Sequence, residues 1–325
     1  MSPSAALRGL DRWQAGHRAL GVPVAVAKKF VDDDAAGLGV QIAYWGFFSV
    51  FSLLLAFTSL LGFAFNGDPG FQQRVLDSTL RLMPVIGPQI SGQTGSLTGS
   101  GVAVAVGLVG AIWTGLGVTL AFGRALDDIW SVPGVDRHGP LSSRSRGLVV
   151  LIIVGGVSVA TTAVVAVAAT GGAESTLARV VSIAGGGCVD VVLFLTSFRL
   201  LTAAAVTIRQ VLPGATLAAG CWLLLQALGG VYVSNVLKGS SQTYGSFAAV
   251  VGLLTWLLIA AELTLVAAEV NVVLARGLWP RSLAGSLRPA DEEALRDSVE
   301  AEQRDRRQRI TVTFEKSAAT GDPEQ

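Results

Sequence analysis

Four polar side chains that could hold a proton or a substrate lie inside long apolar stretches of this sequence. Asp190 lies in "VVSIAGGGCVDVVLFLTSF" and Glu262 in "LLTWLLIAAELTLV", and Glu269 and Asn271 follow shortly after. Ionisable groups at membrane depth are costly, so they are typical of substrate or proton pathways. Glu262 and Glu269 are seven residues apart, which puts them on one helix face about 10 Å apart. The alternative to a functional role is a structural one. The carboxyl groups would then form hydrogen bonds between helices, or the Glu269 side chain would extend to the inner membrane interface.

Two weaker pathway candidates occupy the first apolar stretch. Gln41 and Tyr44 are one helical turn apart in "GVQIAYWGFF". A hydrogen bond that only packs two helices together would explain them equally well.

Motifs of soluble enzyme chemistry are missing from the sequence. It contains no HExxH, CxxC, GxxxxGK[ST] or GxSxG pattern, and Cys188 and Cys221 both lie in apolar stretches as small hydrophobic residues. We therefore predict no enzymatic activity, no metal and no cofactor. Without a phosphate-binding loop, any transport would be secondary, facilitated or powered by a partner.

The composition is that of a membrane protein. Hydrophobic residues make up 51% of the chain, charged residues only 14%, and the mean hydropathy is +0.58. A soluble domain carries about 25% charged residues. The net charge of +1 argues against a nucleic-acid partner and leaves membrane lipids as the expected one.

Six apolar segments are long enough to cross a hydrocarbon core, which needs roughly 20 helical residues. We predict an all-α, polytopic membrane helix bundle with six transmembrane helices. The predicted spans are residues 35–65, 97–122, 147–173, 180–198, 215–236 and 247–273. They divide the chain into an N-terminal amphipathic segment (1–34), a membrane domain (35–275) with an outer amphipathic hairpin (66–96), and a charged tail (276–325).

Lysine and arginine residues set the predicted orientation. Across the alternating connections, up to Arg288, one side holds fourteen of them and the other only four. Because cytoplasmic loops carry the excess of Lys and Arg, both termini should be cytoplasmic and the protein should lie in the cell (inner) membrane.

Charged groups crowd the start of the first span in "KKFVDDDAAGLG". We interpret Lys28 and Lys29 as the inner membrane boundary, and the three aspartates, Asp32 to Asp34, as caps of the following helix. A cation site made by these aspartates is the alternative. Upstream, Trp13 suits a helix lying on the membrane surface.

Two further charged regions are predicted to be solvated. At the inner end of the second span, Arg124 can pair with Asp127 and Asp128 at helical spacing, and Trp130 suits an interfacial anchor. The two aspartates as a cation site are the alternative. The tail from residue 282 alternates acids and arginines, which predicts a solvated helix or disorder.

Several local strings resemble the YihY/BrkB family of inner-membrane proteins. They are "AAGLGVQIAYWGFFSVFSLLL", "RALDDIW", "IRQVLPG" and "YGSFAAVVGLLTWLLIAAELTLVAAEVN", in matching order across residues 30–275. The family has proline where this chain has Ser52, and asparagine where it has Asp127. The family-motif positions are Tyr244, Gly245, Arg209, Pro213, Asp127 and Trp130, together with Glu269 and Asn271.

The resemblance implies six spans, with the "IRQVLPG" string as a turn before the fifth, and a link to envelope integrity or lipid-related export. The sequence does not support the ribonuclease activity once attached to the family, because it has no histidine-rich metal cluster and no basic face for nucleic acid. We expect a secondary or facilitative transporter of a lipid or amphipathic envelope component. The alternative is a non-catalytic scaffold for an envelope complex, with a homo-oligomer or another envelope protein as partner. A membrane-embedded hydrolase would need Asp190 and Glu262 to share a site.

Overall fold

Helices make up most of the described part of the chain. The computed structural model describes residues 5–64, 101–170, 176–232, 238–283 and 287–314, and within these ranges no strand occurs. The predicted outer hairpin over 66–96 lies outside the described residues. The helices are α1 (Ala5–Gly16), α2 (Arg18–Asp32), α3 (Ala35–Ala64), α6 (Gly101–Ile129), α7 (Pro140–Thr170), α8 (Thr176–Leu201), α9 (Ile208–Tyr232), α10 (Lys238–Arg276) and α11 (Pro289–Glu300).

Six of these helices, α3 and α6 to α10, are long and apolar enough to span a membrane, which confirms the predicted number. Several extend past the apolar stretch that predicted them: α7 begins at Pro140 and α9 at Ile208. Backbone hydrogen bonds keep a helix intact where apolar side chains give way to polar ones. As a result, the "IRQVLPG" string lies inside α9, whereas the sequence placed it in a turn before that span.

Apolar side chains also cover the outside of the bundle. Trp113 on α6 is 70% exposed and Ile152 on α7 is 64% exposed. A soluble protein would bury side chains of this size, whereas a lipid bilayer solvates them.

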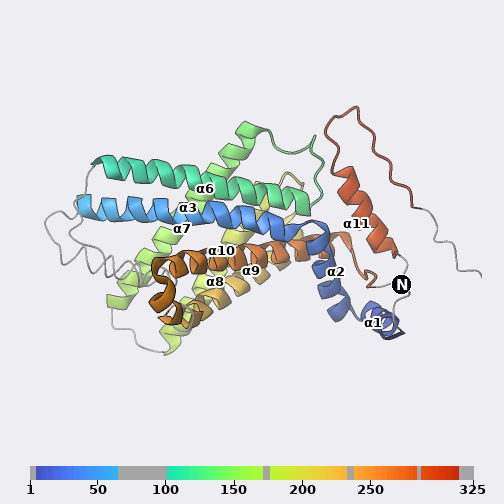
Figure 1. The fold of residues 1–325 in the computed structure, drawn as a ribbon, viewed down its shortest axis with the longest axis horizontal. Helices are drawn as coiled ribbons and strands as arrows, with labels where there is room; N and C mark the ends of the chain where they lie inside the picture. Colours follow the sequence, from blue (N-terminus) through green and yellow to red (C-terminus); the bar gives the residue numbers. More distant parts are fainter. Residues whose placement is uncertain (1–4, 65–100, 171–175, 233–237, 284–286, 315–325) are drawn as a thin grey trace, which may run out of the picture.

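Helices α3 and α6 lie side by side along their length (Figure 1). Glycine permits this approach: a Cβ at Gly107 would lie 2.6 Å from the backbone nitrogen of Ala56, and one at Gly117 would overlap the Trp45 ring. Small residues that let helix backbones come close are the usual means of packing in membranes, where no hydrophobic force drives helices together.

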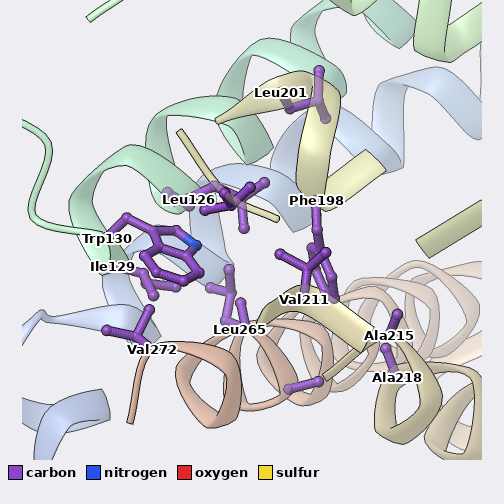
Figure 2. Packing of buried hydrophobic residues seen from close by; sticks show 14 of the residues in the cluster. Leu126, Ile129, Trp130, Phe198, Leu201, Val211, Ala215, Ala218, Leu265 and Val272 are labelled. Atoms are coloured by element: carbon purple, nitrogen blue, oxygen red, sulfur yellow. The ribbon is translucent and has the colours of Figure 1, made fainter. Parts of the chain in front are cut away.

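The buried core is made by the ends of α6, α8, α9 and α10 that lie together. Figure 2 shows Leu126 and Ile129 of α6 facing Phe198 of α8, Val211 of α9 and Leu265 of α10. Trp130 is part of this cluster and is only 4% exposed. The expectation of an interfacial anchor at Trp130 is therefore wrong: its ring packs inside the protein.

Helices α1, α2 and α11 cluster at one end of the bundle (Figure 1). We call it the terminal end, because the first and the last described helix both lie there. The excess of Lys and Arg predicts that this end faces the cytoplasm.

The start of the charged tail is docked on this end rather than solvated. Asp291 of α11 is fully buried, and Arg281 is 1% exposed. Asp291 accepts hydrogen bonds from Lys28 Nζ (2.7 Å), Arg281 Nε (3.0 Å) and the backbone of Ser282 (2.8 Å). The alternating charges of the tail are thus partners for charges of the N-terminal segment, which local sequence could not reveal.

Candidate functional site

An apolar cavity of about 390 Å3 lies among the spanning helices, and Asp190 is the one ionisable group in its lining. Helices α3 and α6 to α10 all contribute to it. Its polar lining residues are Ser158, Asp190, Ser197 and Thr264; the apolar wall includes Ile42, Phe122, Val154, Phe194, Trp222 and Leu257. Volumes of about 300–1,000 Å3 with a few polar groups are typical of ligand sites.

The other two predicted acids lie elsewhere on α10. Glu262 is half-buried and packs against Gly39 of α3: a Cβ at that glycine would lie 3.2 Å from Glu262 Cγ. Glu262 is not among the residues that line the cavity around Asp190. The two acids thus do not form the shared site that a hydrolase would need.

Glu269 belongs to a buried charge cluster with the end of α2. Its Oε2 lies 3.4 Å from Lys29 Nζ, and Lys29 also forms an ion pair with Asp33 and donates to the carbonyl of Ile129 (2.8 Å). Lys29 is 3% exposed and Glu269 is fully buried. We call Lys29, Asp33 and Glu269 the α2–α10 charge cluster. It joins the ends of α2, α6 and α10 near the terminal end.

The charges of this cluster do not cancel. One ammonium faces two carboxyl groups, and neither oxygen of Glu269 accepts a hydrogen bond from the described chain. Burial raises the pKa of Asp33 above its ordinary value, although the ammonium of Lys29 opposes that rise. A single proton shared between Asp33 and Glu269 would make the cluster neutral, and buried charges are stable only when compensated.

Asn271 holds α9 and α10 together. Its Oδ1 accepts the backbone N–H of Gly214 at 2.6 Å, next to Pro213 within α9. A Cβ at Gly214 would overlap the carbonyl oxygen of Ala267 and the Asn271 amide. Both residues are buried, and Asn271 Nδ2 has no partner in the described chain. The geometry supports the packing alternative for Asn271 over a ligand contact.

Asp127 anchors the connection that follows α8. Its Oδ1 accepts hydrogen bonds from the backbone of Ala203 (2.6 Å) and from Thr202 Oγ1 (3.1 Å). Asp128 pairs with Arg137 at 2.6 Å, so neither aspartate pairs with Arg124 as the helical spacing suggested. Long-range partners replace the predicted local ones.

Three further predicted site residues, Gln41, Tyr44 and Arg209, do not line the cavity. Gln41 and Tyr44 are exposed on α3, whereas their neighbours Ile42 and Ala43 line the cavity. Arg209 is exposed at the start of α9. The side chain of Tyr244 and the surroundings of Gly245 are not described.

The three aspartates of the first boundary point to different partners. Asp32 pairs with Arg281 at 2.8 Å, Asp33 pairs with Lys29, and Asp34 has a positive φ of 49° and directly precedes α3. In the described ranges no three His, Cys, Asp or Glu side chains come together as a metal site would require. Only Asp34 is placed to cap α3, because Asp32 and Asp33 belong to the end of α2.

Lys29, Asp33 and the tail network are not recognisable from local sequence patterns as parts of a buried site. The spacing of Lys29 and Asp33 is a usable signal, because four residues place the two side chains on one helix face. Nothing local identifies Glu269 or Asp291 as their partners.

The described part of the chain has six long, apolar helices with a lipid-compatible exterior. This arrangement defines a multi-pass integral membrane protein. The chain matches the family described as virulence factor BrkB over residues 26–287 and belongs to that family. The resemblance seen in the sequence is thereby confirmed. The comparisons with curated proteins and with solved structures find no match.

Proposed function

We propose that this protein is a secondary or facilitative transporter of a lipid or another amphipathic envelope component in the cell inner membrane. The supporting observation is the apolar cavity within the six-span bundle, with Asp190 in its wall. An apolar cavity favours a hydrocarbon chain, and a few polar groups can orient the ligand. The proposal involves no chemical reaction and requires no metal or cofactor.

The α2–α10 charge cluster is a candidate coupling site for this transport. Uptake of one proton by the Asp33–Glu269 pair would change the charge that Lys29 must compensate, and with it the attraction between α2 and α10. Proton relays built from acids within the membrane are a recurring feature of secondary transporters.

The test is lipid movement in liposomes that contain the purified full chain. Fluorescent phospholipid in the outer leaflet is quenched chemically, and lipid that crosses the bilayer is measured by its protection. We expect wild type to accelerate crossing and Asp190→Asn to reduce it about tenfold or more, a loss of about 1.4 kcal/mol in transition-state stabilisation. Glu262→Gln is the matched control, because this span acid lies outside the cavity lining.

The result also separates two hypotheses about the acids. If Asp190→Asn moves lipid at the wild-type rate, the cavity is not the pathway. If Glu262→Gln alone abolishes movement, the pathway follows the α3–α10 contact at Gly39 instead.

The terminal end favours a scaffold as second candidate function. Helices α1, α2 and α11 form a folded platform held by buried ion pairs, and exposed arginines follow α11 at positions 304, 306, 307 and 309. Such a surface suits an acidic partner in an envelope complex or a second copy of the chain.

The scaffold candidate needs a test that leaves the platform folded. Deleting residues 285–325 would remove Asp291 and its ion pairs, so changing the four arginines to glutamine is the better variant. Loss of the envelope phenotype in cells, with unchanged lipid movement in liposomes, would support the scaffold. Unchanged behaviour in both assays would refute it.

A further inference from the structure

A second cavity, of about 320 Å3, opens where α6 ends and α7 begins, and its lining is strongly basic. Three guanidinium groups and one imidazole line it, from Arg124, Arg137, Arg144 and His138. We call it the basic cavity. The acid in its lining is Asp127, whose Oδ1 is engaged by Thr202 and Ala203.

Two of the three arginines have no compensating charge. Arg137 pairs with Asp128, but Arg124 and Arg144 form no ion pair within the described part of the chain. Arginine presents a planar fork of donors that matches the oxygens of a phosphate group. The unpaired guanidinium groups are therefore placed to bind an anion of that geometry.

The first turn of α7 adds to this preference. Pro140 opens the helix and lines the cavity together with Ser143. Pro140 has no N–H, and the Ser143 N–H donates to the Gly139 carbonyl (2.9 Å), so the helix end contributes through its partial positive charge, which favours an anion nearby. The helix end thus reinforces the arginines and acts at the same place.

The setting of the basic cavity suits a lipid headgroup better than a soluble anion. It lies near Ile129, where the candidate span Val104–Ile129 ends, and Leu141, which follows the lining residue Pro140, is 83% exposed. An apolar side chain this exposed beside a cluster of arginines is what the boundary between hydrocarbon and headgroups requires.

The basic cavity also adjoins the apolar cavity along two shared helices. On α6, Val118 and Phe122 line the apolar cavity, and Thr119 and Gly123 line the basic one. On α8, Ser197 lines the apolar cavity and Leu201 the basic one, so four residues, about 6 Å of helix rise, separate the two linings.

We infer that the basic cavity binds the phosphodiester group of an anionic phospholipid, held by Arg124 and Arg144, with an acyl chain directed toward the apolar cavity. The headgroup site stands on its own geometry. The direction of the acyl chain rests on the proposed lipid transport.

The test measures binding rather than transport. Delipidated full-length protein in a neutral detergent is titrated with short-chain phosphatidylglycerol, short-chain phosphatidylcholine or inorganic phosphate. We expect phosphatidylglycerol to bind more tightly than either of the other two. We expect the double variant Arg124→Gln/Arg144→Gln to weaken that binding about tenfold or more, a change of about 1.4 kcal/mol. Arg209→Gln, an exposed arginine of α9 outside this lining, is the charge-matched control and should bind as wild type does.

A third variant guards against a folding defect in the double variant. Arg144→Lys keeps the charge but loses the planar fork, and it should bind with intermediate affinity. Equal binding of the two lipids by wild type, or an unchanged affinity in the double variant, would overturn the inference. Inorganic phosphate that competes as well as phosphatidylglycerol would overturn the assignment to a lipid.

The outcome is independent of the transport assay. A protein that binds phosphatidylglycerol through Arg124 and Arg144 but moves no lipid upholds the headgroup site and refutes the transporter. Lipid movement that depends on Asp190, in a protein that does not bind phosphatidylglycerol through these arginines, upholds the transporter and refutes the headgroup site.

Discussion

Lys29 at the end of α2 and Glu269 near the end of α10 form a buried ion pair, with Nζ and Oε2 3.4 Å apart. The pair joins the segment that precedes the first span to the last span of the bundle. Lys29 also pairs with Asp33, so one ammonium faces two carboxyl groups.

Replacing Lys29 by methionine should destabilise the protein strongly. The change leaves two buried carboxyl groups without a cation, and breaking a buried pair costs ~3–5 kcal/mol. Thermal unfolding in detergent measures the effect. Arg12→Met, at an exposed position of α1, is the control and should unfold at the wild-type temperature. Adding Glu269→Gln to Lys29→Met should recover part of the loss; no recovery would show that the two residues act separately.

The cluster should also make stability depend on pH through Asp33. Burial raises the pKa of Asp33 in the folded protein, with Lys29 acting against the rise. A raised pKa contributes stability that is complete below the unfolded value, about 3.9, and is lost as the pH rises through the folded value.

The variant Asp33→Asn has no carboxyl group at this position, so it does not lose this stability as the pH rises. Its melting temperature relative to wild type should therefore increase as the pH rises from about 4. A difference that stays constant over this range would contradict the prediction. Glu293→Gln on the exposed side of α11 controls for general charge effects.

Asp291 should show the opposite dependence on pH. Burial acts to raise the pKa of Asp291, but hydrogen bonds from Lys28, Ser282, Arg288 and Arg281 outweigh it, and the pKa lies below its ordinary value. The contribution to stability is therefore present above about pH 3.9 and is lost as the pH falls below it.

Replacing Asp291 should release the tail from the terminal end. Asp291→Ala removes the acceptor shared by Lys28 and Arg281 and leaves the buried Arg281 with only Asp32. Limited proteolysis should then cut near α11 much faster than in wild type, because ordering of this helix depends on those pairs. Glu293→Ala, at an exposed position of the same helix, should be cut as slowly as wild type.

The contact between α9 and α10 should be sensitive to one methyl group. Gly214→Ala would force a Cβ into the Ala267 carbonyl and the Asn271 amide, so we expect a clearly lower melting temperature. Gly220→Ala is the matched control, because a Cβ there meets no atom within 4 Å, and it should be neutral or stabilise by up to about 1 kcal/mol. Equal effects of the two substitutions would contradict the close approach.

Asn271→Ala tests the hydrogen bond at the same contact. It leaves the Gly214 N–H buried without its acceptor, which costs about 1–3 kcal/mol. Asn271→Asp keeps an acceptor oxygen but buries a charge without a partner, so it should lose less stability than the alanine variant only at low pH, where the new carboxyl group is protonated. A role for Asn271 in substrate binding alone would instead leave the melting temperature unchanged in both.

The sequence by itself determined the class of fold. Backbone groups in hydrocarbon must be hydrogen-bonded within their own segment, so each apolar stretch of sufficient length has to be a helix, and six such stretches are visible without any tertiary information. The family could be recognised for a similar reason, since its motifs are local strings.

Only the tertiary structure decided which polar groups act together. Trp130 has the sequence of an interfacial anchor, yet its neighbours in space bury it. Asp190 and Glu262 looked equivalent along the chain, but only Asp190 lines the cavity. Lys29 marked a membrane boundary in the sequence, and the fold turned it into the partner of Glu269. The local sequence shows that a charged residue lies in an apolar segment, where burial of its charge is unfavourable. The residue of opposite charge that compensates it lies on a helix distant in sequence.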